Sequence, residues 1–170
     1  MTEIQAVVFD LDGVIIDTEG VWEEVRRAYV AEYGKSFLPD SQNRMMGMST
    51  GEWSTHLSQD VGVPRTPAQV ASDVLGRMAE RYGEALPLIP GSVDAVRRIA
   101  ARYPLALASS SARILIDQVL ETAGLTDAFR VTLSTEEVAR GKPAPDAIEK
   151  ASLIIDTLDE LTVEAVEKLR

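Results

Sequence analysis

The sequence predicts an α/β fold in which helices flank a parallel sheet and a helical segment is inserted after the first strand. Short apolar runs end in polar loops after Phe9, Ala108 and Leu133. Segments with helical spacing alternate with these runs through the second half of the chain, as in a parallel sheet. About seventy mostly helical residues, 17–87, follow the first run, far more than an ordinary connection holds.

The first strand and the insertion set the expected domain boundaries. Residues 4–9, IQAVVF, form a β-branched and aromatic run that ends in Asp-Leu-Asp-Gly, which is typical of a buried strand feeding a loop. We therefore expect an α/β core made of residues 1–16 and 88–170. Residues 17–87 form the expected helical cap.

Three helices are predicted in the inserted segment. Apolar residues recur at helical spacing in 21–34, which closes with a glycine suited to a helix end. A second helix is expected over 51–61. A third is expected over 67–83, with Thr66 as its N-cap and a proline in its first turn.

The second half of the chain alternates between helices and strands. Ser92 and Asp94 are expected to cap a helix over 92–103. The remaining expected elements are, in chain order, strand 105–108, helix 112–123, strand 130–133, strand 152–155 and helix 163–170.

Composition excludes several classes of protein. The 170 residues include 17 basic and 27 acidic side chains, a net charge of −10 that repels nucleic acid. There is no cysteine, and the single His56 cannot make a histidine-based metal site, so any metal must be held by oxygen. No apolar run approaches the roughly 18 residues that span a bilayer, and no secretory signal opens the chain. We therefore expect no nucleic-acid or membrane partner and a cytoplasmic protein.

Two carboxylates follow the first strand, where ligands bind in open α/β sheets. Asp10 is placed to attack phosphorus and form an aspartyl-phosphate. Asp12, aimed at the same spot through a turn that Gly13 allows, is placed to protonate the leaving oxygen and then activate water. Because two close carboxylates repel, the site also calls for a hard divalent cation, and Mg²⁺ fits. The alternative interpretation is a solvated turn.

Two later loops carry further candidates. Ser109 and Ser110, after the second strand, offer a hydroxyl and backbone amides to a phosphoryl group, although such serines more often cap helices or form turns. Lys142, in a rigid GKP loop, could balance the charge of Asp10 and the phosphoryl group. A lone loop lysine is more often simply solvated.

Together, the phrases FDLDGVIIDTE and GKPAPD resemble the motifs of the haloacid-dehalogenase-like hydrolases. The resemblance implies a Rossmann-like catalytic core in which Asp10 is the nucleophile and Asp12 the acid/base. It also implies that Ser109 binds phosphate and that Lys142 balances charge. In that family Mg²⁺ is bound by both aspartates, the second through its backbone carbonyl.

The phrase DGVIIDTEGVW is similar to the branch with a helical cap, which includes sugar-phosphate phosphatases, phosphoglycolate phosphatase and β-phosphoglucomutase. In this cap RMMGMST resembles the substrate-specificity loop, which would turn Arg44 and Gly47 toward the pocket. A surface arginine before a loop glycine is an equally good interpretation. Trp22 and Thr50 stand where the mutases carry His and Arg, which favours a phosphatase over a mutase.

The resemblance fails after GKPAPD, where the family's acidic fourth motif has no counterpart. The tail ASLIIDTLDELTVEAV is similar to the family's last strand and helix, so the join falls near 145–150 and the core sheet is expected to be incomplete. Asp156, Asp159 and Glu160 are not expected to replace the missing metal ligands. Loss of these ligands should weaken both metal binding and phosphoryl transfer.

The sequence therefore predicts a magnesium-dependent phosphatase that acts on a small phosphorylated metabolite, a sugar phosphate in the first instance, through an aspartyl-phosphate. Loss of the fourth motif would impair it. One alternative is a catalytically inactive remnant that serves as a binding or interaction module. The other is a β-phosphoglucomutase-like phosphosugar mutase.

Overall fold

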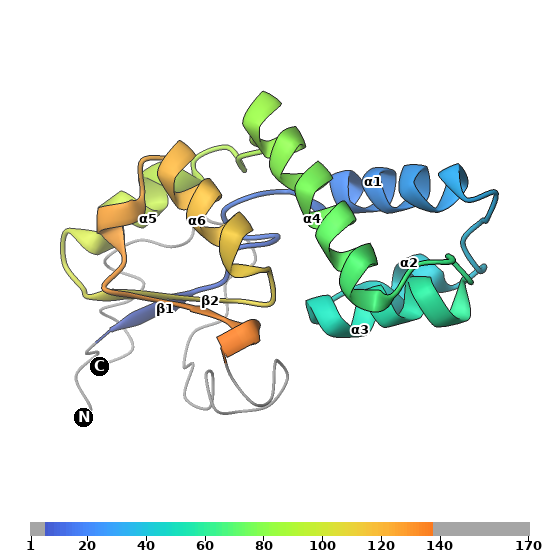
Figure 1. The fold of residues 1–170 in the computed structure, drawn as a ribbon. Coiled ribbons are helices and arrows are strands. Elements are labelled where there is room, and N and C mark those ends of the chain that lie inside the picture. Colours follow the sequence, from blue (N-terminus) through green and yellow to red (C-terminus); the bar gives the residue numbers. More distant parts are fainter. Residues whose placement is uncertain (1–5, 138–170) are drawn as a thin grey trace.

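The computed structural model describes residues 6–137, which form a sheet with its helices and, beside it, a separate group of helices (Figure 1). No helix in this range is long and apolar enough to cross a membrane. The elements are β1 (Val7–Phe9), α1 (Glu19–Glu32), α2 (Ser41–Met45), α3 (Thr50–Thr55), the π-helical turn η1 (His56–Asp60), α4 (Pro67–Glu84), α5 (Ser92–Ala100), β2 (Leu105–Ser109), α6 (Arg113–Thr122), the 3-10 turn η2 (Thr126–Ala128), β3 (Val131–Ser134) and the 3-10 turn η3 (Thr135–Glu137).

The three described strands form one parallel sheet in the order β1-β2-β3. Phe9 of β1 pairs with Leu107, and Ser109 at the end of β2 pairs with Ser134 at the end of β3. Because all three strands point the same way, the loops after them meet at one edge of the sheet. The predicted parallel sheet flanked by helices is confirmed.

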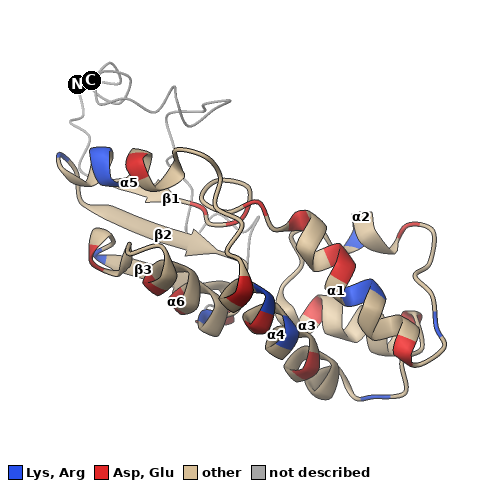
Figure 2. Cartoon of the chain, turned by 90° about the horizontal axis from the view of Figure 1, so that it is seen from above, with Lys and Arg blue, Asp and Glu red and all other residues tan. Residues whose placement is uncertain are grey.

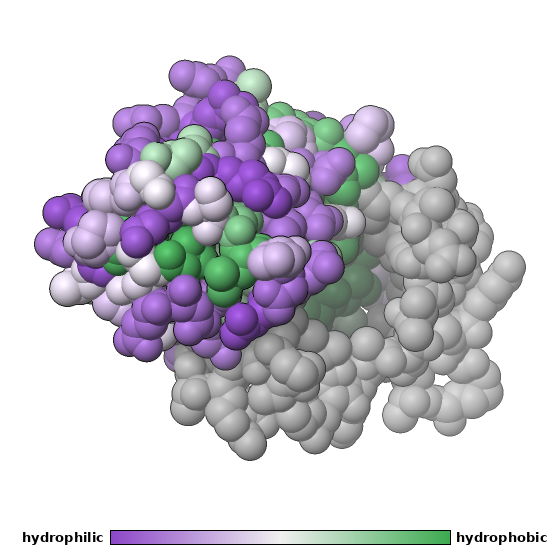
Figure 3. Space-filling view, turned by 90° about the vertical axis from the view of Figure 1, so that its right-hand side faces the viewer, coloured by the Kyte–Doolittle hydropathy of each residue, from purple (hydrophilic) through white to green (hydrophobic). Residues whose placement is uncertain are grey.

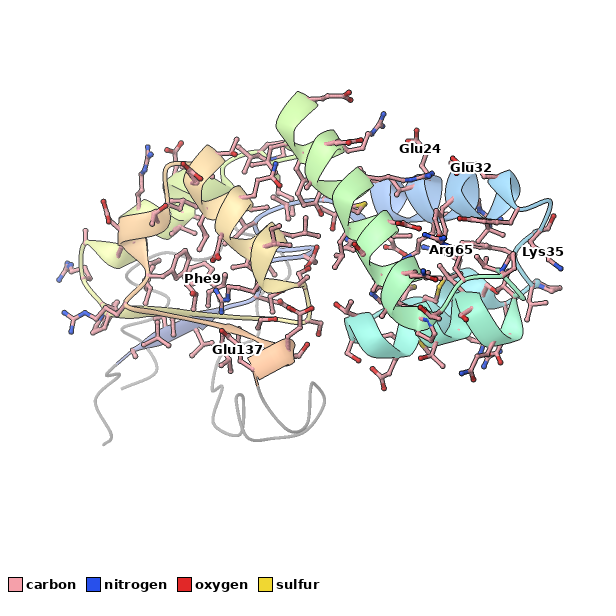
Figure 4. The ribbon with its side chains drawn as sticks, in the orientation of Figure 1. Phe9, Glu24, Glu32, Lys35, Arg65 and Glu137 are labelled. Atoms are coloured by element: carbon pink, nitrogen blue, oxygen red, sulfur yellow. The ribbon has the colours of Figure 1, made fainter. Side chains whose placement is uncertain are left out.

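The core of this half lies between the sheet and helices α5 and α6. Phe9 points from β1 into this space (Figure 4) and meets Phe129 edge to face, with ring centroids 6.0 Å apart. Fully buried side chains from α6 pack against it, as the helical spacing of RILIDQVLET requires. The strands are thereby held in a fixed register, which fixes the positions of the loops at their ends.

Helices α1 to α4 form the separate group, here called the helical cap. Tyr29 of α1 donates a hydrogen bond to Asp73 of α4 at 2.9 Å, and Arg77 of α4 contacts both carboxylate oxygens of Glu32 at 2.7 Å. Glu32 projects from α1 in Figure 4. Seen from its outer end, the cap is mostly hydrophilic around a smaller apolar area (Figure 3).

Two connecting segments join the cap to the core side by side. The Asp17 N–H donates to the Pro87 carbonyl at 2.8 Å, and the Ile89 N–H donates to the Ile15 carbonyl at 3.0 Å. The chain therefore leaves and re-enters the core at one place. The domain boundaries at 17 and 87 remain a prediction.

Some sequence-based details are wrong. Ser92 does not cap the helix after the connector, because Gly91 takes the left-handed conformation (φ 79°) and lets the Ser92 N–H bond to Ile89. Ser92 thus lies inside α5, and α5 ends at Ala100 rather than at 103. The expected helix 51–61 is α3 followed by the π-helical turn, and α2 was not predicted. The expected elements at 152–155 and 163–170 lie outside the described residues.

The start of α4 is fixed by a reciprocal pair of hydrogen bonds. Thr66 Oγ1 accepts from the Gln69 N–H at 3.3 Å, and the Gln69 side chain accepts from the Thr66 N–H at 3.1 Å. We expect Thr66→Ala to lower the free energy of unfolding by about 1 kcal/mol, since the Gln69 N–H loses its partner. Urea titration followed by circular dichroism measures this. Thr122→Ala, at the exposed end of α6, is the matched control, and an equal loss there would contradict the role of the cap.

Candidate active site

A cavity of about 570 Å³ lies where the loops at the sheet edge face the helical cap. Acidic residues follow β1 and begin α1 along this stretch of chain (Figure 2). The core and the cap both contribute to the wall, which is lined by Asp10, Asp12, Gly13, Asp17, Thr18, Glu19, Trp22, Arg26, Gln42, Met45, Met46, Gly47, Met48, Thr50, Trp53, Ser110, Ser111 and Ala112.

The loop after β1 holds both predicted carboxylates on this wall. Gly13 adopts φ 77°, a conformation that favours glycine, and its N–H donates to the Ile16 carbonyl at 2.8 Å. The Leu11 N–H donates to Asp10 Oδ1 at 2.8 Å, which orients that carboxylate. The turn therefore brings Asp12 back to the same cavity as Asp10, as the DxDG pattern predicts. The Gly13 amide is already used within the turn.

Three hydroxyl groups converge on the Asp12 carboxylate. Thr18 donates to Oδ1 at 2.6 Å, Ser111 donates to Oδ2 at 2.6 Å, and Ser109 lies 3.4 Å from Oδ2. Thr18 immediately precedes α1, Ser109 ends β2, and Ser111 lies in the loop after β2. A hydroxyl can donate or accept, so this cluster can hold Asp12 with or without a proton.

The segment 109–111, here called the serine loop, is itself anchored to β3. Ser134 Oγ donates to the Ser111 carbonyl at 2.8 Å, and the Ser111 N–H donates to Ser109 Oγ at 3.0 Å. Arg113 Nη2 donates to the Thr132 carbonyl at 3.0 Å on the neighbouring strand. Glu137, near the end of β3 in Figure 4, accepts the Ser134 N–H at 2.8 Å. These bonds fix the loop before any ligand arrives.

The three serines occupy different positions relative to the cavity. Ser109 is only 1% exposed and lies beneath the cavity, whereas Ser110 and Ser111 line it. Ser111 was not among the predicted site residues. Its one sequence signal is that it follows Ser109 at a spacing of two.

The remaining predicted residues fall in different places. Gly47 lines the cavity, as do Trp22 and Thr50, the residues that stand in the mutase positions. Arg44 lies outside the cavity lining, exposed and 3.4 Å from Asp60. Its guanidinium is drawn to the nearest carboxylate on the cap surface. Lys142 lies outside the described residues.

A second polar cluster inside the cap has the residue types of a catalytic triad. His56 lies 2.9 Å from Ser41 Oγ through Nε2 and 2.7 Å from Asp60 through Nδ1. Ser41 is fully buried, however, and its Oγ also accepts the Leu38 N–H at 3.1 Å. No substrate can reach this hydroxyl, so the cluster supports the structure of the cap.

Where Asp10 and Asp12 line the cavity, their oxygen atoms are candidate metal ligands. Within residues 6–137 no group of three or more His, Cys, Asp and Glu side chains could enclose a metal ion. Magnesium, however, is commonly held by one or two carboxylates together with water and substrate phosphate. The Asp10 and Asp12 oxygens fit that donor set.

Comparison with known proteins decides the family. Residues 7–163 match the family described as haloacid dehalogenase-like hydrolase. The chain belongs to this family. The haloacid dehalogenase-like assignment made from FDLDGV and GKPAPD is thus confirmed, together with its helical-cap branch.

Two relatives of this chain have phosphatase activity in their names. The chain is 29% identical over 162 residues to the bifunctional riboflavin kinase/FMN phosphatase of Arabidopsis thaliana, covering 93% of this chain and 42% of that protein. It is 29% identical over 171 residues to hexitol phosphatase B of Escherichia coli K12, covering 97% and 75%. The chain thus spans less than half of the first relative and three quarters of the second.

Solved structures agree on the fold. CbbY from Rhodobacter sphaeroides, in complex with phosphate, superposes with a TM-score of 0.71 at 22% identity, covering 85% of this chain and 69% of that one. β-Phosphoglucomutase from Clostridium difficile gives a TM-score of 0.70 at 18% identity, covering 96% and 71%.

Proposed function

We propose that this hydrolase is a magnesium-dependent phosphatase of a small phosphorylated metabolite, working through an aspartyl-phosphate. The observation that carries the proposal is the meeting of Asp10 and Asp12 on one cavity wall, with the Asp12 carboxylate oriented by hydroxyls from two other segments. The names of two relatives, hexitol phosphatase B of Escherichia coli and the phosphorylated carbohydrates phosphatase of Thermotoga maritima, support this class of substrate.

In the proposed cycle an Asp10 carboxylate oxygen attacks phosphorus and the bond to the leaving oxygen breaks. Asp12 gives its proton to that oxygen, so the alcohol leaves neutral. Asp12 then takes a proton from water, which attacks phosphorus, releases inorganic phosphate and restores the Asp10 carboxylate. The Thr18 and Ser111 hydroxyls keep Asp12 in place in both protonation states.

The phosphoryl group would lie against the serine loop, where Ser110 lines the cavity. Magnesium held by the Asp10 and Asp12 oxygens would supply positive charge to the phosphoryl oxygens. Lys142, Ser109, Gly13, Arg44 and Gly47 keep their predicted roles as hypotheses. Trp22 on the cavity wall offers no proton-transfer group, which favours hydrolysis over transfer between two sugar positions.

Phosphate release from p-nitrophenyl phosphate and from a panel of sugar phosphates tests the proposal. We expect release that requires added magnesium and stops when a chelator removes it. A folded protein that releases no phosphate from any compound would instead be an inactive remnant. Movement of phosphate between two positions of a sugar, without release, would identify a mutase.

A further inference from the structure

One basic side chain faces the acidic cavity from the cap. Arg26 of α1 is 6% exposed and is the only basic residue among the described residues lining the cavity. Its guanidinium carbon lies 4.4 Å from the ring centroid of Trp22 and 4.9 Å from that of Trp53. The two rings come from different helices and are 5.8 Å apart. Arg26 thus contacts aromatic rings supplied by both α1 and α3.

No acidic side chain within residues 6–137 forms an ion pair with Arg26. Other cap arginines have carboxylate partners, as Arg77 has Glu32 and Arg81 has Glu24. The Nε of Arg26 is buried without a hydrogen-bond acceptor. An unpaired buried cation is costly, and contact with tryptophan rings recovers only part of that cost.

Burial lowers the pKa of Arg26 to about 10, against the opposing influence of Tyr82 and Asp12. The side chain therefore remains a cation at neutral pH. Gln42 lines the same cavity, and its Oε1 is also buried without a hydrogen-bond partner. Among the described residues, the cap wall thus presents a cation without a carboxylate partner and an acceptor without a hydrogen-bond donor.

Helix geometry places Arg26 at a useful distance from the proposed chemistry. Thr18, Trp22 and Arg26 follow one another at intervals of four, so they lie along one side of α1. Thr18, just before the helix, bonds to Asp12, and eight residues correspond to about 12 Å of helix. Because side chains lean toward the helix N-terminus, the Arg26 side chain reaches back along α1 toward the end at which Thr18 holds Asp12.

We propose that Arg26 binds a second anionic group on the substrate, several carbons from the phosphoryl group that is cleaved. The preferred substrate would then be a phosphorylated sugar acid or a sugar bisphosphate rather than a neutral sugar monophosphate. The planar guanidinium suits either oxyanion, since both accept paired hydrogen bonds from it. This inference rests on the proposed phosphatase function and names its substrate class.

Three open-chain six-carbon probes test the inference. Sorbitol 6-phosphate ends in a neutral hydroxymethyl group, gluconate 6-phosphate ends in a carboxylate, and sorbitol 1,6-bisphosphate ends in a second phosphate. We expect kcat/KM for at least one of the two doubly anionic probes to exceed that for sorbitol 6-phosphate by about tenfold or more. The doubly anionic probe with the higher kcat/KM shows whether the second group is a carboxylate or a phosphate.

Substitution at Arg26 should remove this preference. In Arg26→Gln the ratio of kcat/KM for the preferred doubly anionic probe to kcat/KM for sorbitol 6-phosphate should fall to about one. Arg26→Lys, which keeps the charge, should retain part of the preference. Arg27→Gln is the matched control, because Arg27 is exposed on the same helix and pairs with Glu23. Its ratio should equal that of the wild type.

Hydrolysis and ligand-induced thermal stabilisation together distinguish failure of the Arg26 inference from failure of the phosphatase proposal. If p-nitrophenyl phosphate is hydrolysed but the wild type shows no preference, or Arg26→Gln keeps it while folded, the Arg26 inference is overturned and the phosphatase stands. If no probe is hydrolysed, yet gluconate 6-phosphate or the bisphosphate stabilises the wild type and not Arg26→Gln, the phosphatase proposal fails and anion binding at Arg26 is supported. Absence of both effects overturns both.

Discussion

Asp10→Asn is expected to reduce magnesium-dependent phosphate release by about a thousandfold or more, because an amide cannot attack phosphorus as a carboxylate does. The replacement has nearly the same shape, and its side-chain oxygen can still accept the Leu11 N–H that now bonds to Asp10. The loss should therefore appear in kcat with no change in the unfolding midpoint. Steady-state phosphate release together with urea titration measures both.

Asp94→Asn is the matched control for this loss, since it removes one carboxylate from the exposed side of α5 and changes the net charge equally. Acid-quenched wild-type protein should also carry a phosphoryl group on Asp10, detectable by mass spectrometry. Full activity in the Asp10→Asn protein would show that another group attacks phosphorus.

The ends of the strands could be predicted because short segments of the sequence are enough to locate them. An apolar run that stops at Asp10, and another that stops at Ser109, locate the sheet edge without knowledge of the rest of the chain. The turn at Gly13 is equally local, since only a residue without Cβ takes its conformation cheaply. These features of the fold and of the site followed from short segments.

The partners of those residues could not be predicted in the same way. Ser111 meets Asp12 across 99 positions of sequence, and only the register of β1 and β2 brings them together. Arg26 looks like one more charged residue on an amphipathic helix. Its surroundings include Trp53, which α3 brings against Arg26 through packing that helical spacing does not specify.

Arg44 illustrates the opposite case, in which a motif is matched but the side chain lies outside the cavity lining. The short helix α2 ends at Met45 and directs Arg44 to Asp60 on the cap surface, while the following Gly47 reaches the cavity. Neighbouring residues of a loop motif can thus face different surfaces, because the direction of the backbone cannot be read from the motif sequence. Its role in substrate binding remains a hypothesis.

Asp12→Asn is expected to affect substrates according to their leaving groups. A sugar phosphate needs a proton on its departing oxygen, so its turnover should fall by about 10²- to 10⁴-fold. Formation of the aspartyl-phosphate from p-nitrophenyl phosphate needs less help, because nitrophenolate leaves without a proton. Water activation is also lost, so a rapid burst of nitrophenol equal to the protein concentration should precede slow turnover. Stopped-flow absorbance measures the burst.

Asparagine is the appropriate replacement because its side chain can still bond to the Thr18 and Ser111 hydroxyls that hold Asp12. Asp117→Asn, an exposed carboxylate on α6, is the matched control and should show no burst. Thr18→Val should slow both substrates to a similar and smaller extent, since it removes one hydrogen bond that positions the carboxylate but leaves the proton donor. Equal losses for both leaving groups in Asp12→Asn, without a burst, would reduce Asp12 to the same positioning role.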